Sequence, residues 1–185
     1  PKNPIIGFRS FGENKKIVAE KAIALMKGIQ GNGVFTTGKH FPGHGDTATD
    51  SHYALPLVTA SKEHLELVEL YPYKWMFDEG MVSVMVAHLS VPSLEPDANV
   101  PSSLSKKVVT DLLKNELGFD GLIFTDALNM KAASNFKKPG DIDVDALLAG
   151  NDVLLFSENV PVAVEKLRTA FQNGTLTEER LAESV

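Results

Sequence analysis

The sequence contains no cysteine among its 185 residues. Disulfide scaffolds, thiol nucleophiles and cysteine-bound zinc or iron–sulfur sites are therefore excluded. The sequence also has no apolar run near the ~18 residues that a membrane-spanning helix requires. We therefore expect no membrane span.

Basic residues are fewer than acidic ones, with 18 Lys and Arg against 24 Asp and Glu, which gives a net charge of −6. Proteins that bind nucleic acids or anionic membranes usually present an excess of positive charge, so we expect neither partner. The hydrophobic content of 43% is that of an ordinary globular domain. A chain without cysteine works in either redox environment, so the compartment stays open.

Hydrophobic periodicity predicts helices that alternate with short apolar strands. The expected helices begin after Asn14, Ser61 and Ser105, at 141 and 161, and near Thr177, and the second is kinked or restarted at Pro72. The expected strands cover residues 34–39, 81–87, 121–125 and 152–156. This alternation favours a parallel sheet, either in a (β/α) barrel or in a doubly wound fold. In both, the site lies where the strands end.

Residues 39–52 form a polar loop that follows the first expected strand and holds three of the five histidines. The segment has three interpretations. It is a polar surface loop, or a metal site that uses His40, His44 and Asp46, or an acid–base site. In the last case Asp50 orients the imidazole of His52, two residues further on, toward a substrate.

Three further polar residues stand at expected strand ends. Asp126 either caps the next helix or directs a carboxylate into a site as a nucleophile or base. Lys39 is either a surface cation or a ligand for substrate oxygens. His88 is either a satisfied polar group at a strand end or part of the same site.

Three blocks of the sequence resemble glycoside hydrolase family 3. They read RSFG at residues 9–12, KHFPGHG at 39–45 followed by DSH at 50–52, and IFTD at 123–126. The second block is the most specific, and it resembles the β-N-acetylglucosaminidase (β-hexosaminidase) branch, which includes bacterial enzymes of peptidoglycan recycling. The blocks occur in the order of the family, and the resemblance covers nearly the whole chain.

The resemblance implies an α/β fold, namely a parallel (β/α) TIM-type barrel of which the C-terminal half to two-thirds is present. Residues 1–185 would then be the C-terminal portion of a family 3 barrel domain, truncated at both ends. The implied ligand is a saccharide that contains N-acetylglucosamine. A half barrel exposes strand edges, so we also expect association with the N-terminal part or with a second copy. The compartment would be the bacterial cytoplasm or periplasm.

The resemblance also implies a reaction, which is the retaining hydrolysis of terminal β-linked N-acetylglucosamine. Asp126 corresponds to the nucleophile, His52 to the general acid and then base, and Asp50 to the partner of His52. The family's usual Ser-Asp-Asp is Thr-Asp-Ala here, which keeps the nucleophile.

Arg9, Lys39 and His40 correspond to residues that hydrogen-bond the sugar ring. The resemblance implies neither a cofactor nor a metal. Two alternatives to hydrolysis stay open, namely phosphorolysis, in which phosphate replaces water, and a non-catalytic sugar-binding fragment.

Overall fold

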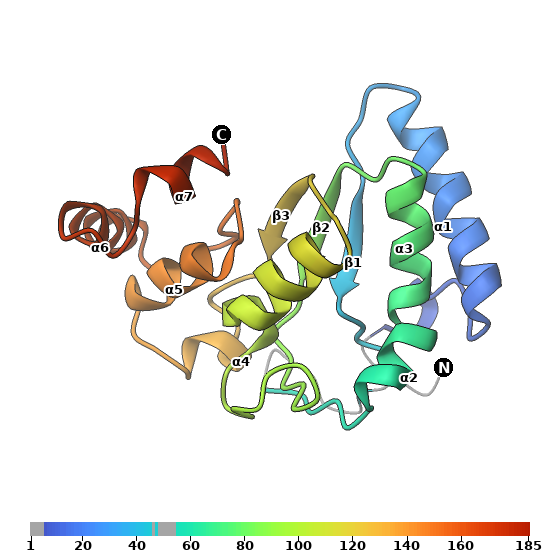
Figure 1. Ribbon diagram of the computed structural model, residues 1–185, viewed down its shortest axis with the longest axis horizontal. Coiled ribbons are helices and arrows are strands. Elements are labelled where there is room, and N and C mark those ends of the chain that lie inside the picture. The colour runs from blue at the N-terminus through green and yellow to red at the C-terminus, as the bar shows by residue number, and fades with distance from the viewer. Residues whose placement is uncertain (1–5, 46, 48–54) are drawn as a thin grey trace.

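The computed structural model describes residues 6–45, 47 and 55–185 (Figure 1). Within them, three strands form one sheet: β1 (Thr37–Phe41), β2 (Ser83–Val86) and β3 (Leu122–Thr125). The strands lie in the order β1-β2-β3 and all run parallel. The expected α/β class with a parallel sheet is therefore confirmed.

Helices precede, connect and follow these strands. They are η1 (Gly7–Arg9), α1 (Lys15–Gln30), α2 (Lys62–Leu67), α3 (Leu70–Asp78), η2 (Ser102–Leu104), η3 (Lys107–Glu116), α4 (Lys131–Ser134), α5 (Asp141–Ala149), α6 (Val160–Gln172) and α7 (Glu178–Ala182). The side chains of Asn14 and Ser61 accept backbone N–H groups at the starts of α1 and α2, as expected of caps. The helix after Ser61 does restart, but at Leu70 rather than at Pro72. Pro72 lies in the first turn of α3, where its missing N–H breaks no helical hydrogen bond.

The hydrophobic core lies between the sheet and helices α1, α3 and η3, of which α1 and α3 stand side by side (Figure 1). Val84 of β2 and Ile123 of β3 are fully buried in this core. Their neighbours Met85 and Phe124 are only half-buried. Successive side chains of a strand point to opposite faces, so the described helices cover one face of the sheet more completely than the other.

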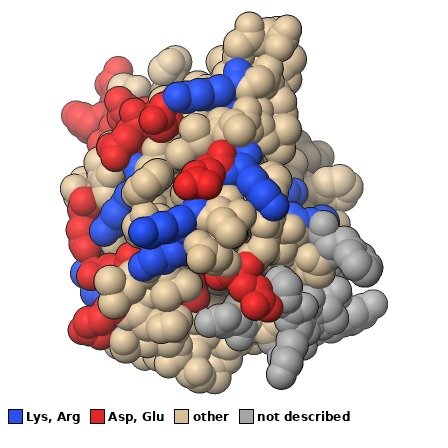
Figure 2. All heavy atoms as spheres, turned by 90° about the vertical axis from the view of Figure 1, so that its right-hand side faces the viewer, with Lys and Arg blue, Asp and Glu red and all other residues tan. Residues whose placement is uncertain are grey.

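The surface formed by α1 carries both signs of charge, with Lys and Arg side chains among Asp and Glu side chains (Figure 2). For example, Lys27 of α1 pairs with Glu79, which follows α3. No helix within the described ranges is both long and apolar enough to cross a bilayer.

The first strand differs from the expected 34–39 because it begins at Thr37 and continues to Phe41. Val34 and Phe35 have strong strand propensity but are 58% and 72% exposed. Strand propensity reflects packing on a half-buried surface. Because Val34 and Phe35 are this exposed, they do not pair with β2.

The prediction of a fourth strand at 152–156 is wrong. The structure has a single parallel bridge there, between Phe124 and Val153. The backbone N–H of Ile123 in β3 donates to the side-chain carboxylate of Asp152. In a paired strand, a backbone carbonyl would accept this hydrogen. Phe156 has a φ of 54°, which ends the extended conformation.

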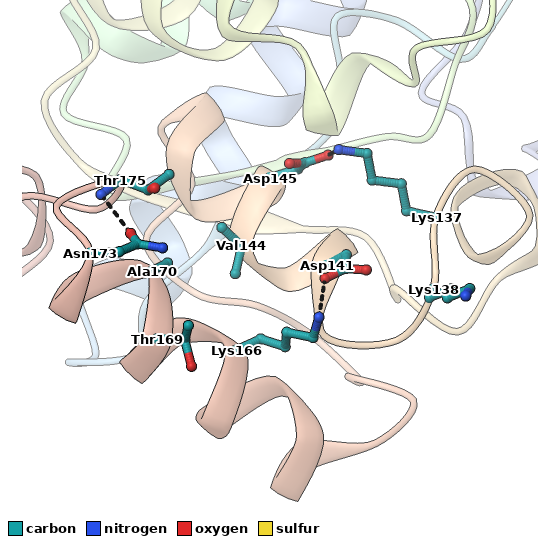
Figure 3. A pocket seen from close by; sticks show the side chains of 10 residues that line it. All are labelled: Lys137, Lys138, Asp141, Val144, Asp145, Lys166, Thr169, Ala170, Asn173 and Thr175. Carbon is teal, nitrogen blue, oxygen red and sulfur yellow. Dashed lines mark hydrogen bonds and ion pairs between the residues drawn. The ribbon is translucent and has the colours of Figure 1, made fainter.

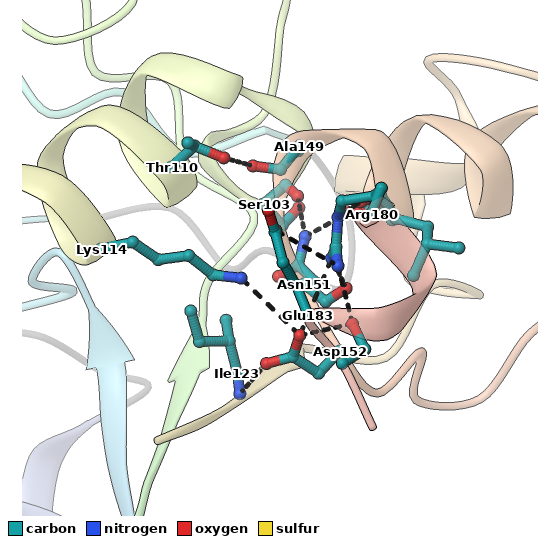
Figure 4. A network of polar contacts seen from close by, with 12 residues as sticks. Ser103, Thr110, Lys114, Ile123, Ala149, Asn151, Asp152, Arg180 and Glu183 are labelled. Carbon is teal, nitrogen blue, oxygen red and sulfur yellow. Dashed lines mark hydrogen bonds and ion pairs between the residues drawn. The ribbon is translucent and has the colours of Figure 1, made fainter. Parts of the chain in front are cut away.

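Asp152 is the centre of a polar network that ties the C-terminal helix to the sheet (Figure 4). Its carboxylate accepts the Ser184 hydroxyl at 2.6 Å and lies 3.7 Å from both the Lys114 ammonium of η3 and the Arg180 guanidinium of α7. A carboxylate that is buried needs such partners. The helix expected from Thr177 begins as predicted but ends at Ala182 rather than at the last residue.

The helix expected after Ser105 is present, and the Ser105 hydroxyl accepts a backbone N–H of its first turn at 3.3 Å. However, η3 is a π-helix with i→i+5 bonding. The sequence does not distinguish this winding from an α-helix. Four apolar residues of η3 are buried. These are Val108, Val109, Leu112 and Leu113.

Candidate active site

The ends of β1 and β3 bring two of the predicted site residues together. Lys39 pairs with Met85 and Phe41 pairs with Val86, so His40 is an inserted residue in β1. Such bulges redirect side chains at the ends of strands. The inserted imidazole faces the turn after β3, and its Nε2 lies 3.9 Å from Oδ2 of Asp126.

Asp126 is held by its own backbone and by its neighbour. Its N–H donates to the carbonyl of Val86 at 2.9 Å, and its Oδ1 accepts the N–H of Ala127 at 2.9 Å. The capping alternative is wrong, since the cap residue of the following α4 is Met130. One carboxylate oxygen is thus committed to the turn, and Oδ2 faces His40.

The imidazole of His40 is neutral at physiological pH. Burial lowers its pKa to about 4, the nearby Asp126 carboxylate opposes this change, and the charges of Lys39, His44 and Arg9 add to it. Its Nδ1 is buried and has no hydrogen-bond partner among the described residues. The contact with Asp126 is therefore not an ion pair, and at 3.9 Å it is too long for a hydrogen bond.

Lys39 and Arg9 place positive charge next to this pair. Both side chains are near enough to His40 to lower its pKa, and both residues are exposed. The structure thus places His40 next to Asp126, and the charges of Lys39 and Arg9 act on His40. Their roles in sugar binding stay predictions from the resemblance. Two cations beside a carboxylate and a neutral imidazole can bind a polar, uncharged ligand such as a sugar.

His44 lies beside His40, with 5.9 Å between the two ring centroids. Its Nδ1 lies 2.7 Å from the hydroxyl of Thr47. In the described part of the chain, no three His, Asp or Glu side chains gather closely enough to hold a metal ion. Asp46, the third member of the alternative metal set, lies outside the described residues.

Asp50 and His52, the predicted acid–base pair, also lie outside the described residues. Their roles therefore stay predictions from the resemblance.

His88 is a strand-end residue whose contact with the turn after β3 the sequence did not predict. It is fully buried, and its Nε2 lies 3.0 Å from the carbonyl of Ala127. Its Nδ1 lies 2.6 Å from the hydroxyl of Ser103, in η2. No sequence signal pointed to Ser103, which is a short polar residue without a motif.

A hollow lies between α5, α6 and the segment before α5 (Figure 3). Its charges mostly satisfy one another, since Lys166 pairs with Asp141 at 2.9 Å and Lys137 pairs with Asp145. None of the predicted site residues lines it. The candidate site is therefore at the strand ends, where parallel α/β folds carry their functional residues.

All 185 residues match the model of the glycosyl hydrolase family 3 N-terminal domain. The chain belongs to glycosyl hydrolase family 3. This membership agrees with the three sequence blocks and with the strand-end position of Asp126.

The family 3 chain is 38% identical over 168 residues to a protein named beta-hexosaminidase from Nitrosomonas eutropha, covering 91% of this chain and 47% of that protein. A solved β-N-acetylglucosaminidase of family 3 from Paenibacillus matches with a TM-score of 0.95 at 42% identity, covering 100% of this chain and 35% of that one. The chain thus spans about half or less of the length of these relatives.

A third similar structure is the beta-glucoside phosphorylase BglX, with a TM-score of 0.93 at 29% identity, covering 100% of this chain and 35% of that one. The family 3 chain therefore resembles proteins named for hydrolysis and for phosphorolysis. The match to the barrel domains of the family confirms the TIM-type parallel fold, of which this chain covers a part.

Proposed function

We propose that this chain carries the nucleophile and sugar-binding residues of a retaining exo-β-N-acetylglucosaminidase. The observation that carries this proposal is the geometry of Asp126, whose Oδ1 accepts an N–H of the turn while Oδ2 faces His40 at 3.9 Å. A carboxylate fixed in this way presents one oxygen to an anomeric carbon. The names of the similar proteins support the sugar.

The reaction has two steps. In the first, Oδ2 of Asp126 forms a bond to the anomeric carbon while the glycosidic bond breaks, and the leaving oxygen takes a proton from His52. In the second, His52 takes a proton from water, the water oxygen attacks the anomeric carbon, and the bond to Asp126 breaks. Asp50 orients His52 and favours its protonated form.

The sugar-binding groups have complementary properties. The His40 ring is neutral, so it hydrogen-bonds a hydroxyl without placing a positive charge against the developing oxocarbenium ion. Lys39 and Arg9 donate to sugar oxygens from the exposed side. The proposed substrates are saccharides that end in β-linked N-acetylglucosamine, among them peptidoglycan fragments.

Phosphorolysis is the second candidate, favoured by the similarity to the phosphorylase BglX. The two reactions share Asp126 and differ only in the acceptor of the second step. Incubation with substrate in phosphate buffer, followed by NMR of the products, distinguishes them. Hydrolysis gives free N-acetylglucosamine, whereas phosphorolysis gives its 1-phosphate.

The proposal is tested by Asp126→Asn, measured on 4-nitrophenyl N-acetyl-β-glucosaminide with the natural full-length protein. We expect kcat/KM to fall by about 10⁴-fold, as for other residues that form covalent intermediates. Asp120→Asn is the matched control, because Asp120 is exposed and precedes β3 at its other end. Activity of Asp126→Asn equal to that of the control would remove Asp126 as the nucleophile.

A further inference from the structure

His88 lies at the end of β2, between the turn that carries Asp126 and the segment that carries Ser103. It is 0% exposed. Its two ring nitrogens make contacts of 3.0 Å with the carbonyl of Ala127 and 2.6 Å with the hydroxyl of Ser103. A buried imidazole with both nitrogens engaged is held in one orientation.

The chemistry of these two partners fixes where the proton of His88 lies. A carbonyl oxygen only accepts, so Nε2 carries the hydrogen and donates it to Ala127. Burial lowers the pKa of His88, and the Asp126 charge and the bonds to the turn oppose this only in part. The ring is therefore neutral, and its Nδ1 accepts the hydroxyl hydrogen of Ser103.

Ser103 is itself fixed, because it is fully buried and its carbonyl accepts Nδ2 of Asn151 at 2.8 Å (Figure 4). Asn151 follows α5, and its Nδ2 also donates to the carbonyl of Ala146 in that helix at 2.7 Å. The ring of His88 is thus connected through Ser103 and Asn151 to η2 and α5, as well as to the turn after β3.

The bond from His88 acts on the residue next to the proposed nucleophile. Ala127 donates its N–H to Oδ1 of Asp126 at 2.9 Å and accepts Nε2–H of His88 on its carbonyl. A displacement of Ala127 would therefore move the donor that orients the carboxylate. A displacement of about 1 Å at a reacting group can cost about 10²-fold in rate.

We infer that His88 is a positioning residue, which holds the Asp126–Ala127 turn through its Nε2–H so that Oδ2 of Asp126 faces the sugar. This inference rests on the proposed function of Asp126. His88 touches Ala127 and Ser103 rather than the open side of the site, so it acts on the rate of glycosyl transfer and not on the binding of the sugar.

The test compares His88→Gln with His88→Met in the natural full-length protein. The two side chains have nearly the same shape, but only Gln carries a donor near the position of Nε2. We expect His88→Gln to keep kcat within about 10-fold of wild type and His88→Met to lose about 10²-fold in kcat, with KM changed less than about threefold in both. Equal values of kcat for the two variants would overturn the inference.

Asp126→Asn in the same assay separates this inference from the proposed function. If Asp126→Asn is active, the proposed function fails, whatever the two His88 variants do. If it is inactive and the Gln and Met variants are equal, only the role of His88 fails.

Ser103→Ala keeps the test decisive even where His88→Met does not fold. It removes the hydroxyl that fixes the ring but leaves both His88 and Ala127 in place. We expect a loss of about 3- to 10-fold in kcat, an unchanged KM and a cooperative thermal transition. A wild-type kcat in a folded Ser103→Ala protein would contradict the inference.

Discussion

The ends of β1 and β3 face each other in the site, but they hold their polar side chains in different ways. At the end of β3, Asp126 is fixed by bonds from its own N–H and to its Oδ1, and its turn is held by His88. At the end of β1, Lys39 is exposed and His40 is an inserted residue whose Nδ1 has no partner in the described part of the chain.

This difference matches the two roles proposed for these residues, nucleophilic attack at the end of β3 and sugar binding at the end of β1. A nucleophile must meet one carbon atom from one direction, so its position is fixed before the substrate arrives. Residues that bind sugar hydroxyls complete their hydrogen bonds only with the ligand. Substitutions at the end of β3 should therefore lower the rate of the reaction, and substitutions at the end of β1 should mainly weaken the binding of the sugar.

Among the variants that keep the charge of a site residue, the largest effect is expected from Asp126→Glu, which extends the side chain by one methylene. The turn after β3 is held from several sides, so it cannot retreat to compensate. We expect kcat on an aryl N-acetylglucosaminide to fall by about 10³-fold. Lys39→Arg, which likewise keeps the charge of a residue at the end of β1, should cost less than about 10-fold in kcat/KM. If steady-state kinetics gave equal losses of activity for Asp126→Glu and Lys39→Arg, the two strand ends would not differ in how strictly they fix their side chains.

The next effect concerns His52, which follows β1 in the sequence. We expect His52→Ala to lose about 10²-fold on an N-acetylglucosamine disaccharide, because its leaving group requires a proton. A dinitrophenyl glycoside, whose leaving group requires little protonation, should lose less than about 10-fold in the first step. His64→Ala on α2 is the control. Equal losses of His52→Ala on both substrates would contradict its role as the acid.

The third effect is on stability. The pKa of His40 is about 4 in the folded chain, below the ordinary 6.5, so the unfolded chain binds a proton first as the pH falls. The free energy of unfolding should therefore decrease by about 2 kcal/mol as the pH falls from 6.5 to 4 on account of this residue, and the decrease should stop below pH 4.

Urea denaturation as a function of pH checks this prediction. His40→Asn removes the titrating group, so the variant should lose less stability than wild type over the same range. His88 has the same sign of effect, since burial lowers its pKa also, and part of the acid sensitivity should persist in the variant. An unchanged pH dependence in His40→Asn would show that His40 is not buried as described.

The smallest effect is expected for Lys39→Met, which removes one cation from the end of β1. We expect KM to rise about 10-fold, with kcat changed less than threefold, because an exposed donor contributes to binding about equally in the ground and transition states. Lys74→Met on α3 is the control. A fall in kcat with unchanged KM would show that Lys39 acts in the transition state, as Asp126 does, and not in sugar binding.

The sequence predicted the starts of helices best, because a single capping residue decides where a helix begins. Asn14 and Ser61 cap their helices as expected, because caps depend on neighbours in sequence. Helix α5 also begins at its predicted residue, Asp141. Strand edges were predicted less well, since pairing at 34–35 and 152–156 depends on packing with distant segments.

The resemblance assigned Asp126, Arg9, Lys39 and His40 to one sugar site. In the structure His40 lies 3.9 Å from Asp126, and the charges of Lys39 and Arg9 act on His40, while the roles of these residues stay predictions. The bond between His88 and Ala127 and the bond between His88 and Ser103 could not be predicted. Both join residues 15 or more positions apart that only tertiary packing brings together.

The central claim is that Asp126 forms the covalent intermediate, and trapping that intermediate tests it most directly. A fluorinated N-acetylglucosaminyl substrate with a reactive leaving group slows the second step, so the glycosyl-enzyme accumulates. Peptide mass spectrometry of the trapped natural protein should find the sugar mass on Asp126, and Asp126→Asn should remain unlabelled. A sugar bound to another residue, or turnover without any labelled peptide, would contradict the account.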